Sequence, residues 1–84
     1  MNKYKFRAEC SHDVVEFIIK IRTQLINFKM DSVPGFPDVE FEFETELRLD
    51  KIITVLKSIG DSHVMYQTVK PLAEYTGERN YSLN

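Results

Sequence analysis

Two segments of this sequence alternate apolar and charged residues with a period of two. Residues 3–10 combine an apolar row with a mostly basic row, and residues 39–46 combine an apolar row with four glutamates. The apolar rows are Tyr4, Phe6, Ala8 and Cys10 in the first segment, and Val39, Phe41, Phe43 and Thr45 in the second. This alternation is typical of β-strands, whose successive side chains point to opposite faces of a sheet. Because opposite charges favour cross-strand neighbours, we expect these two strands to pair antiparallel.

Two stretches have the spacing of amphipathic helices. Val14, Ile18, Ile21 and Leu25 recur at intervals of four, three and four residues, which predicts a helix after the first strand. We expect Ser11 or Asp13 to cap its start, with Glu16 completing a capping arrangement. A second helix is predicted by the apolar residues Leu49, Ile52, Ile53, Leu56 and Ile59, with Gly60 at its C-terminal end.

The remaining segments predict two further strands and a tail. Ile26, Phe28 and Met30 alternate with polar residues, and the proline-containing segment 33–38 then forms the turn into the glutamate-bearing strand. Residues 63–69, His-Val-Met-Tyr-Gln-Thr-Val, are rich in residues that favour β-structure and predict a fourth strand that stops at Pro71. We therefore expect a single domain over residues 1–70 and a C-terminal tail over residues 71–84.

The order of these elements is strand, helix, strand, strand, helix, strand. That order predicts an α+β, ferredoxin-like split βαβ fold (βαββαβ), a four-stranded antiparallel sheet of order 4-1-3-2 with two helices on one face. Strands one and three are then central neighbours, which agrees with the complementary charges of their exposed rows. The Lys/Arg row and the glutamate row lie together on the open face.

Composition narrows the classes of partner. The chain has 84 residues, 43% of them hydrophobic and 29% charged, and a formal charge of −2, so it is ordinary for one globular domain and has no electrostatic attraction for nucleic acid. No apolar run approaches the roughly 20 residues that span a bilayer, so we expect no membrane association. Cys10 is the sole cysteine, which excludes an internal disulfide and agrees with a cytoplasmic location.

Candidate chemical groups are sparse. Cys10, His12 and Asp13 lie close together in sequence, but a structural zinc site needs four ligands, and Cys10 also continues the inward apolar row, which predicts that it is buried. We expect His12 to be exposed in a loop, and His63 to lie at a strand edge. The sequence therefore assigns no catalytic residue, metal ion or cofactor, and it favours a non-enzymatic role.

The predicted sheet has two edge strands, and strand 63–70 lacks lysine and proline before Lys70 and Pro71. An edge without such residues offers unpaired backbone groups to another chain. We therefore predict a protein-interaction or self-association module, including a homodimer, in which the partner is another protein or a second copy. The predicted interaction residues are Val64, Tyr66 and Thr68 on the edge strand and Tyr75, Arg79 and Tyr81 in the tail.

The alternative function is a regulatory domain that binds a small molecule or an anion. Its site is the loop at the start of the first helix, where free backbone N–H groups and the helix dipole favour negative charge. The residues of this predicted site are Cys10, Ser11, His12 and Asp13. The carboxylate of Asp13 argues against an anion at this position.

Overall fold

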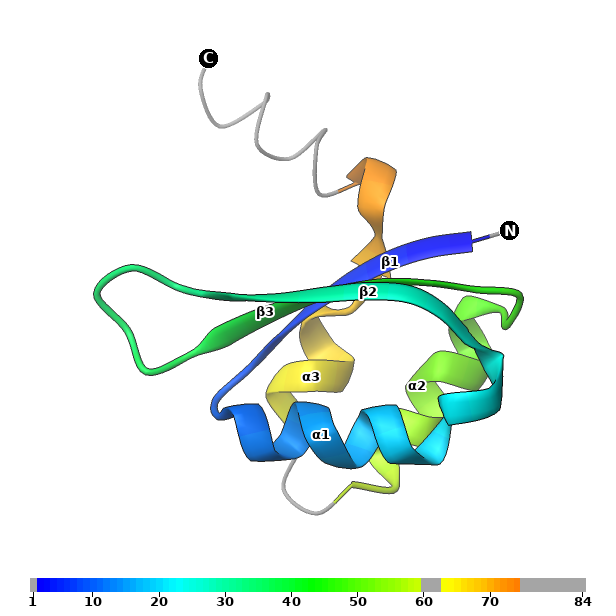
Figure 1. Cartoon of the computed structure of the whole chain (residues 1–84), viewed down its shortest axis with the longest axis horizontal. Helices are drawn as coiled ribbons and strands as arrows, with labels where there is room; N and C mark the ends of the chain where they lie inside the picture. The colour runs from blue at the N-terminus through cyan, green and yellow to red at the C-terminus, as the bar shows by residue number, and fades with distance from the viewer. Residues whose placement is uncertain (1, 60–62, 75–84) are drawn as a thin grey trace.

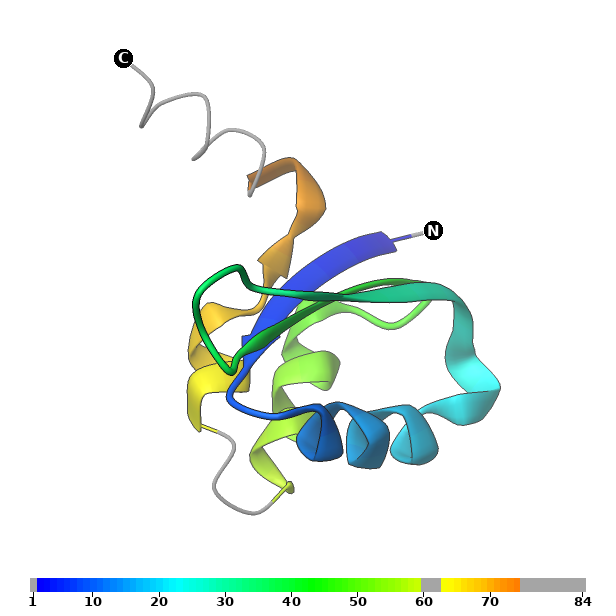
Figure 2. The ribbon, with the colours of Figure 1, turned by 60° about the vertical axis from the view of Figure 1, so that its left-hand side comes forward.

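A computed structural model describes residues 2–59 and 63–74 of the chain. In chain order the elements are β1 (Asn2–Ala8), α1 (Ser11–Lys20), the short 3-10 helix η1 (Arg22–Gln24), β2 (Leu25–Ser32), β3 (Val39–Thr45), α2 (Leu49–Lys57), α3 (His63–Thr68) and β4 (Lys70–Pro71). Figure 1 and Figure 2 show the helices α1, α2 and α3 together on one side of the sheet. We call the other side of the sheet, which α1, α2 and α3 do not cover, the open face.

The sheet is antiparallel and its strand order is β2-β3-β1-β4. This is the predicted order 4-1-3-2 in reverse, so the predicted topology of the sheet is confirmed. β1 and β3 pair along their whole length, with Lys3 opposite Glu44 and Lys5 opposite Glu42. The pairing of the basic strand with the acidic strand, expected from their charges, is therefore also confirmed.

An aromatic cluster fills the space between the sheet and the helices. Phe6, Phe41 and Phe43 project from the two central strands, and all three are fully buried or nearly so. Phe17 reaches up from α1, and its ring centroid lies 5.2 Å from that of Phe6 and 5.2 Å from that of Phe43. Edge-to-face contacts of this kind add to the gain from apolar burial. These contacts hold α1 against β1 and β3.

The start of α1 corrects two predictions. The helix begins at Ser11 and its N-cap residue is Cys10, with no side-chain hydrogen bond to the cap, so the predicted capping by Ser11 or Asp13 is wrong. Cys10 is exposed, whereas it was predicted to be buried. β1 ends at Ala8 and the chain then turns, so the strand alternation that would have directed Cys10 inward has already stopped.

The connection between β3 and α2 is held by side-chain hydrogen bonds. Thr45, the last residue of β3, is fully buried, and its hydroxyl oxygen accepts a bond from the Leu47 N–H at 3.2 Å. The Tyr4 hydroxyl donates to the Leu47 carbonyl at 3.0 Å. α2 then places Ile52 and Leu56 in the core, as the predicted helical spacing required.

The predicted fourth strand is wrong for most of its length. Residues 63–68 form the helix α3, and β4 comprises only Lys70 and Pro71, the latter predicted to belong to the tail. Met65 and Val69 are both buried, whereas Gln67 between them is exposed. A strand would place all three side chains on one face, so this pattern is helical. The Val69 N–H donates to the Met65 carbonyl at 3.1 Å. The domain therefore has an additional helix before its last strand.

Phe17→Ala is expected to lower the free energy of unfolding by about 3–5 kcal/mol, because it leaves a cavity in the centre of the aromatic cluster. Ile19→Ala on the same helix is the matched control, since Ile19 is 67% exposed, and it should change stability by no more than about 0.5 kcal/mol. Urea unfolding followed by circular dichroism measures both values. Equal effects of the two substitutions would contradict the described core.

Because of Tyr4, we expect the free energy of unfolding to depend on pH in the alkaline range. Burial raises the pKa of the Tyr4 phenol above its ordinary value of 10.0, with a further increase from the Asp50 carboxylate and an opposing effect of Arg48. Because the folded state favours the neutral phenol, this stabilisation is complete below about pH 10 and is lost as the pH rises through the raised pKa. Unfolding free energies measured across this range should therefore decline more steeply for the natural chain than for Tyr4→Phe. Parallel declines would contradict the assignment.

Candidate functional site

The two edge strands of the sheet differ in length and in how far other parts of the chain cover them. At one edge lies β4, which has two residues and ends with Pro71. At the other edge lies β2, which has eight residues and contains no proline. A long edge strand presents a row of unpaired N–H and C=O groups to other chains, whereas a short one ending in proline does not. The two edges are therefore not equivalent as binding surfaces.

Beyond β4, the outer edge of β1 is closed by α3. The Arg7 N–H donates to the Thr68 hydroxyl oxygen at 2.9 Å, and the same hydroxyl donates to the Val64 carbonyl at 2.6 Å. The Thr68 side chain therefore satisfies a backbone donor that an additional strand would otherwise pair with. This side of the sheet is closed to strand addition at Arg7.

β2 carries a row of exposed apolar side chains. We call this row the β2 edge, defined by Ile26, Phe28 and Met30, which are 46%, 56% and 45% exposed. Phe28 lies opposite Phe43 and Met30 lies opposite Phe41, so both side chains project to the side of the sheet that the helices occupy.

The exposure of the β2 edge follows from where the helix layer ends. Phe17 of α1 contacts the rings of Phe6, Phe41 and Phe43, which belong to the two central strands. Phe28 packs against this cluster from the side, with its ring centroid 5.6 Å from that of Phe41, and it keeps more than half of its surface in water. Large exposed apolar groups gathered on one strand are typical of an interaction surface.

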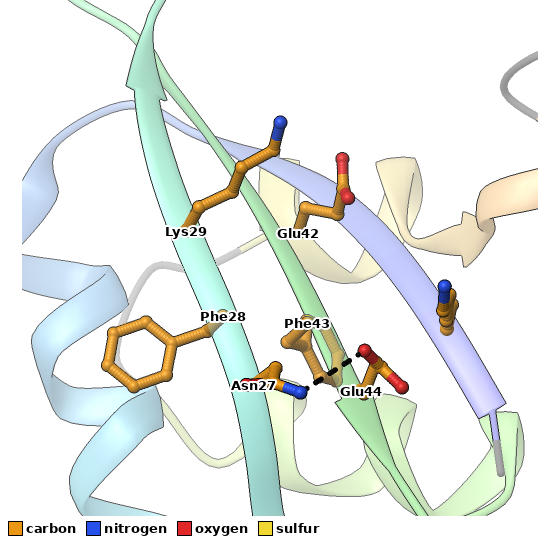
Figure 3. A pocket seen from close by; sticks show the side chains of 7 residues that line it. Asn27, Phe28, Lys29, Glu42, Phe43 and Glu44 are labelled. Atoms are coloured by element: carbon orange, nitrogen blue, oxygen red, sulfur yellow. Dashed lines mark hydrogen bonds between the residues drawn. The ribbon is translucent and has the colours of Figure 1, made fainter.

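On the open face a shallow depression of about 170 Å³ runs beside the β2 edge. Figure 3 shows the side chains of Lys29 and Glu42 rising together from it, and the Asn27 amide donating to a Glu44 carboxylate oxygen at 3.4 Å. The depression is small in comparison with small-molecule pockets, which commonly have volumes of about 300–1,000 Å³. Because it is small and open to solvent, it forms a border of the β2 edge rather than an enclosed ligand site.

Opposite charges are matched along the open face. Lys5 Nζ lies 3.3 Å from Glu40 Oε1, and Arg7 Nε lies 2.7 Å from Asp38 Oδ2. The Arg7 guanidinium also covers the ring of Phe36 at 5.2 Å from its centroid. The Lys5–Glu40 pair thus links the basic row to the glutamate row. The exclusion of nucleic acid as a partner stays a prediction.

The interaction residues predicted for residues 63–70 do not lie on an edge strand. Val64, Tyr66 and Thr68 lie on α3, where all three are half-buried. Tyr66 packs against the core and lies under Lys57 Nζ, 5.3 Å from its ring centroid, and Thr68 closes the edge of β1. The other predicted residues, Tyr75, Arg79 and Tyr81, lie outside the described residues.

The alternative ligand loop forms the first turn of α1. Cys10, Ser11 and His12 are exposed, and His12 Nε2 lies 3.4 Å from Glu16 Oε1 on the next turn. His63 lies instead at the start of α3, with Nε2 4.0 Å from Glu9 Oε1. In residues 2–59 and 63–74, no group of three or more His, Cys, Asp or Glu side chains is arranged to hold a metal ion. Binding of a small molecule or an anion at this loop stays a prediction.

Comparison of the chain with family models, curated proteins and solved structures found no match. Within the described ranges, every helix is too short or too polar to pass through a lipid bilayer. The inference of function therefore depends on the surface of the domain itself.

Thr68→Val is expected to lower the free energy of unfolding by about 1–2 kcal/mol, because it leaves the Arg7 N–H without its acceptor. Thr54→Val is the matched control, since Thr54 is exposed and its hydroxyl donates to the Asp50 carbonyl within α2. A change within about 0.5 kcal/mol is expected for this variant. Amide hydrogen exchange should show faster exchange at Arg7 in the first variant. Unchanged protection at Arg7 would show that Thr68 does not close this edge.

Proposed function

We propose that this protein is a non-enzymatic interaction module that binds an extended strand of another polypeptide along β2. The observation that carries the proposal is the row of exposed apolar side chains on an eight-residue edge strand. The role is the one expected from the sequence, but its location moves from residues 63–70 to the opposite edge of the sheet. Residues 63–68 are helical and have no strand edge to offer.

Strand addition uses two features of the β2 edge together. Main-chain N–H and C=O groups on the outer side of an edge strand supply affinity, and alternating side chains on the added strand supply specificity. On the helix side, an added strand would place its apolar side chains against Phe28 and Met30. On the open side, it would place polar side chains beside Asn27, Lys29 and Asp31. The preferred ligand is therefore an amphipathic strand.

We further propose that the fold is a ferredoxin-like split βαβ domain with α3 inserted before the last strand. The strand order and the position of the helices on one side support this view. Such folds host unrelated activities, so the fold does not by itself define a function. The proposal for function accordingly depends on the β2 edge.

Selection of phage-displayed random peptides on the immobilised full chain tests the proposal. The enriched peptides should alternate apolar and polar residues, and Phe28→Ser should weaken their binding by about tenfold or more, because apolar burial against the ring is lost. Phe36→Ser is the matched control, since Phe36 is a 62% exposed phenylalanine in the turn between β2 and β3. Thermal melts confirm that both variants are folded.

Peptides that bind the Phe28→Ser variant with the same affinity as the natural chain would place the binding surface elsewhere and contradict the proposal. Failure to enrich any peptide would contradict it as well. A competition experiment provides a second test. All selected peptides should displace one another if they bind at the same strand, β2.

A further inference from the structure

We propose that the strand bound at β2 is the β2 strand of a second copy of this chain, in an antiparallel register centred on Met30. This inference rests on the proposed function, and it specifies the partner. A two-fold axis perpendicular to the sheet would join two β2 strands side by side. The two four-stranded sheets would then form one continuous sheet with all helices on the same side.

The strand itself limits the registers that such a pairing allows. Directly opposite residues in an antiparallel pair share one face of the sheet. The axis must therefore pass midway between the two copies of one β2 residue, which lie opposite each other. The pairing of β2 with β3 is regular from Asn27 to Ser32, and a register shift lies between Leu25 and Asn27. Bulges of this kind disturb the ladder and turn the strand away from a neighbour. A register centred on Phe28 would extend over this irregular part and is disfavoured.

Charge decides among the remaining registers. A register centred on Lys29 would place the two Lys29 side chains opposite each other, and one centred on Asp31 would do the same with two carboxylates. Like charges directly opposite are destabilising. The register centred on Met30 instead places Lys29 opposite the partner's Asp31, and the two-fold axis repeats that pair. A register centred on Ser32 would leave most of β2 unpaired.

The register centred on Met30 also provides a counter-charge for Asp31. Asp31 lies opposite Glu40 in the β2–β3 pairing, so two carboxylates are neighbours on the open face, and Glu40 already has Lys5 at 3.3 Å. In residues 2–59 and 63–74, Asp31 has no ion pair within 4.0 Å. The partner's Lys29 would supply a cation at this position.

Apolar contacts also fit this arrangement. Met30 would lie opposite the partner's Met30, and Phe28 would lie diagonal to it on the helix side of the joined sheet. Diagonal neighbours are within reach of aromatic and other long side chains. Both side chains are about half exposed in one copy, at 56% and 45%, so the pairing removes apolar surface from water.

Charge reversal tests the register by sedimentation velocity over a wide concentration range. The natural chain should show a monomer–dimer equilibrium. Lys29→Asp and Asp31→Lys should each weaken the dimer by about tenfold or more, because both symmetry-related pairs change from attraction to repulsion. The double variant Lys29→Asp/Asp31→Lys should restore association, since it recreates both pairs with reversed polarity.

The two single variants have opposite effects within one copy, which separates association from folding. Asp31→Lys places a cation opposite Glu40, so it should leave the monomer as stable as the natural chain or more stable while weakening the dimer. Lys29→Asp places a second carboxylate opposite Glu42 and should destabilise the monomer. Urea unfolding at low protein concentration measures these monomer stabilities.

Three outcomes would overturn the inference. These are a natural chain that stays monomeric at all concentrations, a dimer that tolerates both single reversals, and a double variant that does not recover. A monomeric chain that still binds the selected peptides through Phe28 would overturn self-pairing and leave the proposed function standing. A chain that neither dimerises nor binds peptides through Phe28 would overturn both proposals.

Discussion

The antiparallel pairing of β1 with β3 is the contact on which the rest of the structure depends. Towards the helices, the paired strands present Phe6, Phe41 and Phe43 as one aromatic surface, and Phe17 closes it from below. Away from the helices, a basic row faces a glutamate row in register. A slip of one residue would exchange the two faces, sending the aromatic rings into water and glutamates into the core. Burial and charge therefore select the same register, and this central pair determines which strands become the edges.

Much of the sheet was predictable because its signals are local and agree with each other. Period-two alternation marks β1 and β3, and their opposite charges indicate that they are neighbours. The spacing of Val14, Ile18 and Ile21 indicates α1, but the predicted extension of the helix to Leu25 is wrong, because α1 ends at Lys20 and Leu25 begins β2. The segment His63–Thr68 was not predictable in this way, since its residue types favour a strand. Tertiary packing overrides that preference, because a helix places Met65 and Val69 in the core and gives the Thr68 hydroxyl access to the backbone of β1.

The candidate site illustrates a different limit of sequence reasoning. The alternation of Ile26, Phe28 and Met30 identifies a strand, and the predicted topology places that strand at an edge. Its apolar row nevertheless resembles the buried rows of β1 and β3, and Lys29 resembles a residue that protects an edge. Whether the row is covered depends on how far the helix layer extends across the sheet. Phe17 packs beneath the two central strands, and only three-dimensional packing of this kind shows that the layer stops short of β2.

The unequal edges have a consequence for the size of any assembly. A sheet with two accessible edges can add copies without end and grow into a fibre. Here the side of β1 beyond Arg7 is sealed by Thr68 and by a strand that ends in Pro71. In the proposed dimer, joining two molecules through β2 would use up the exposed β2 edge of each, so growth would end after a single step. In the proposed dimer, the Thr68 hydroxyl would therefore help to limit assembly to two copies, although it lies far from β2.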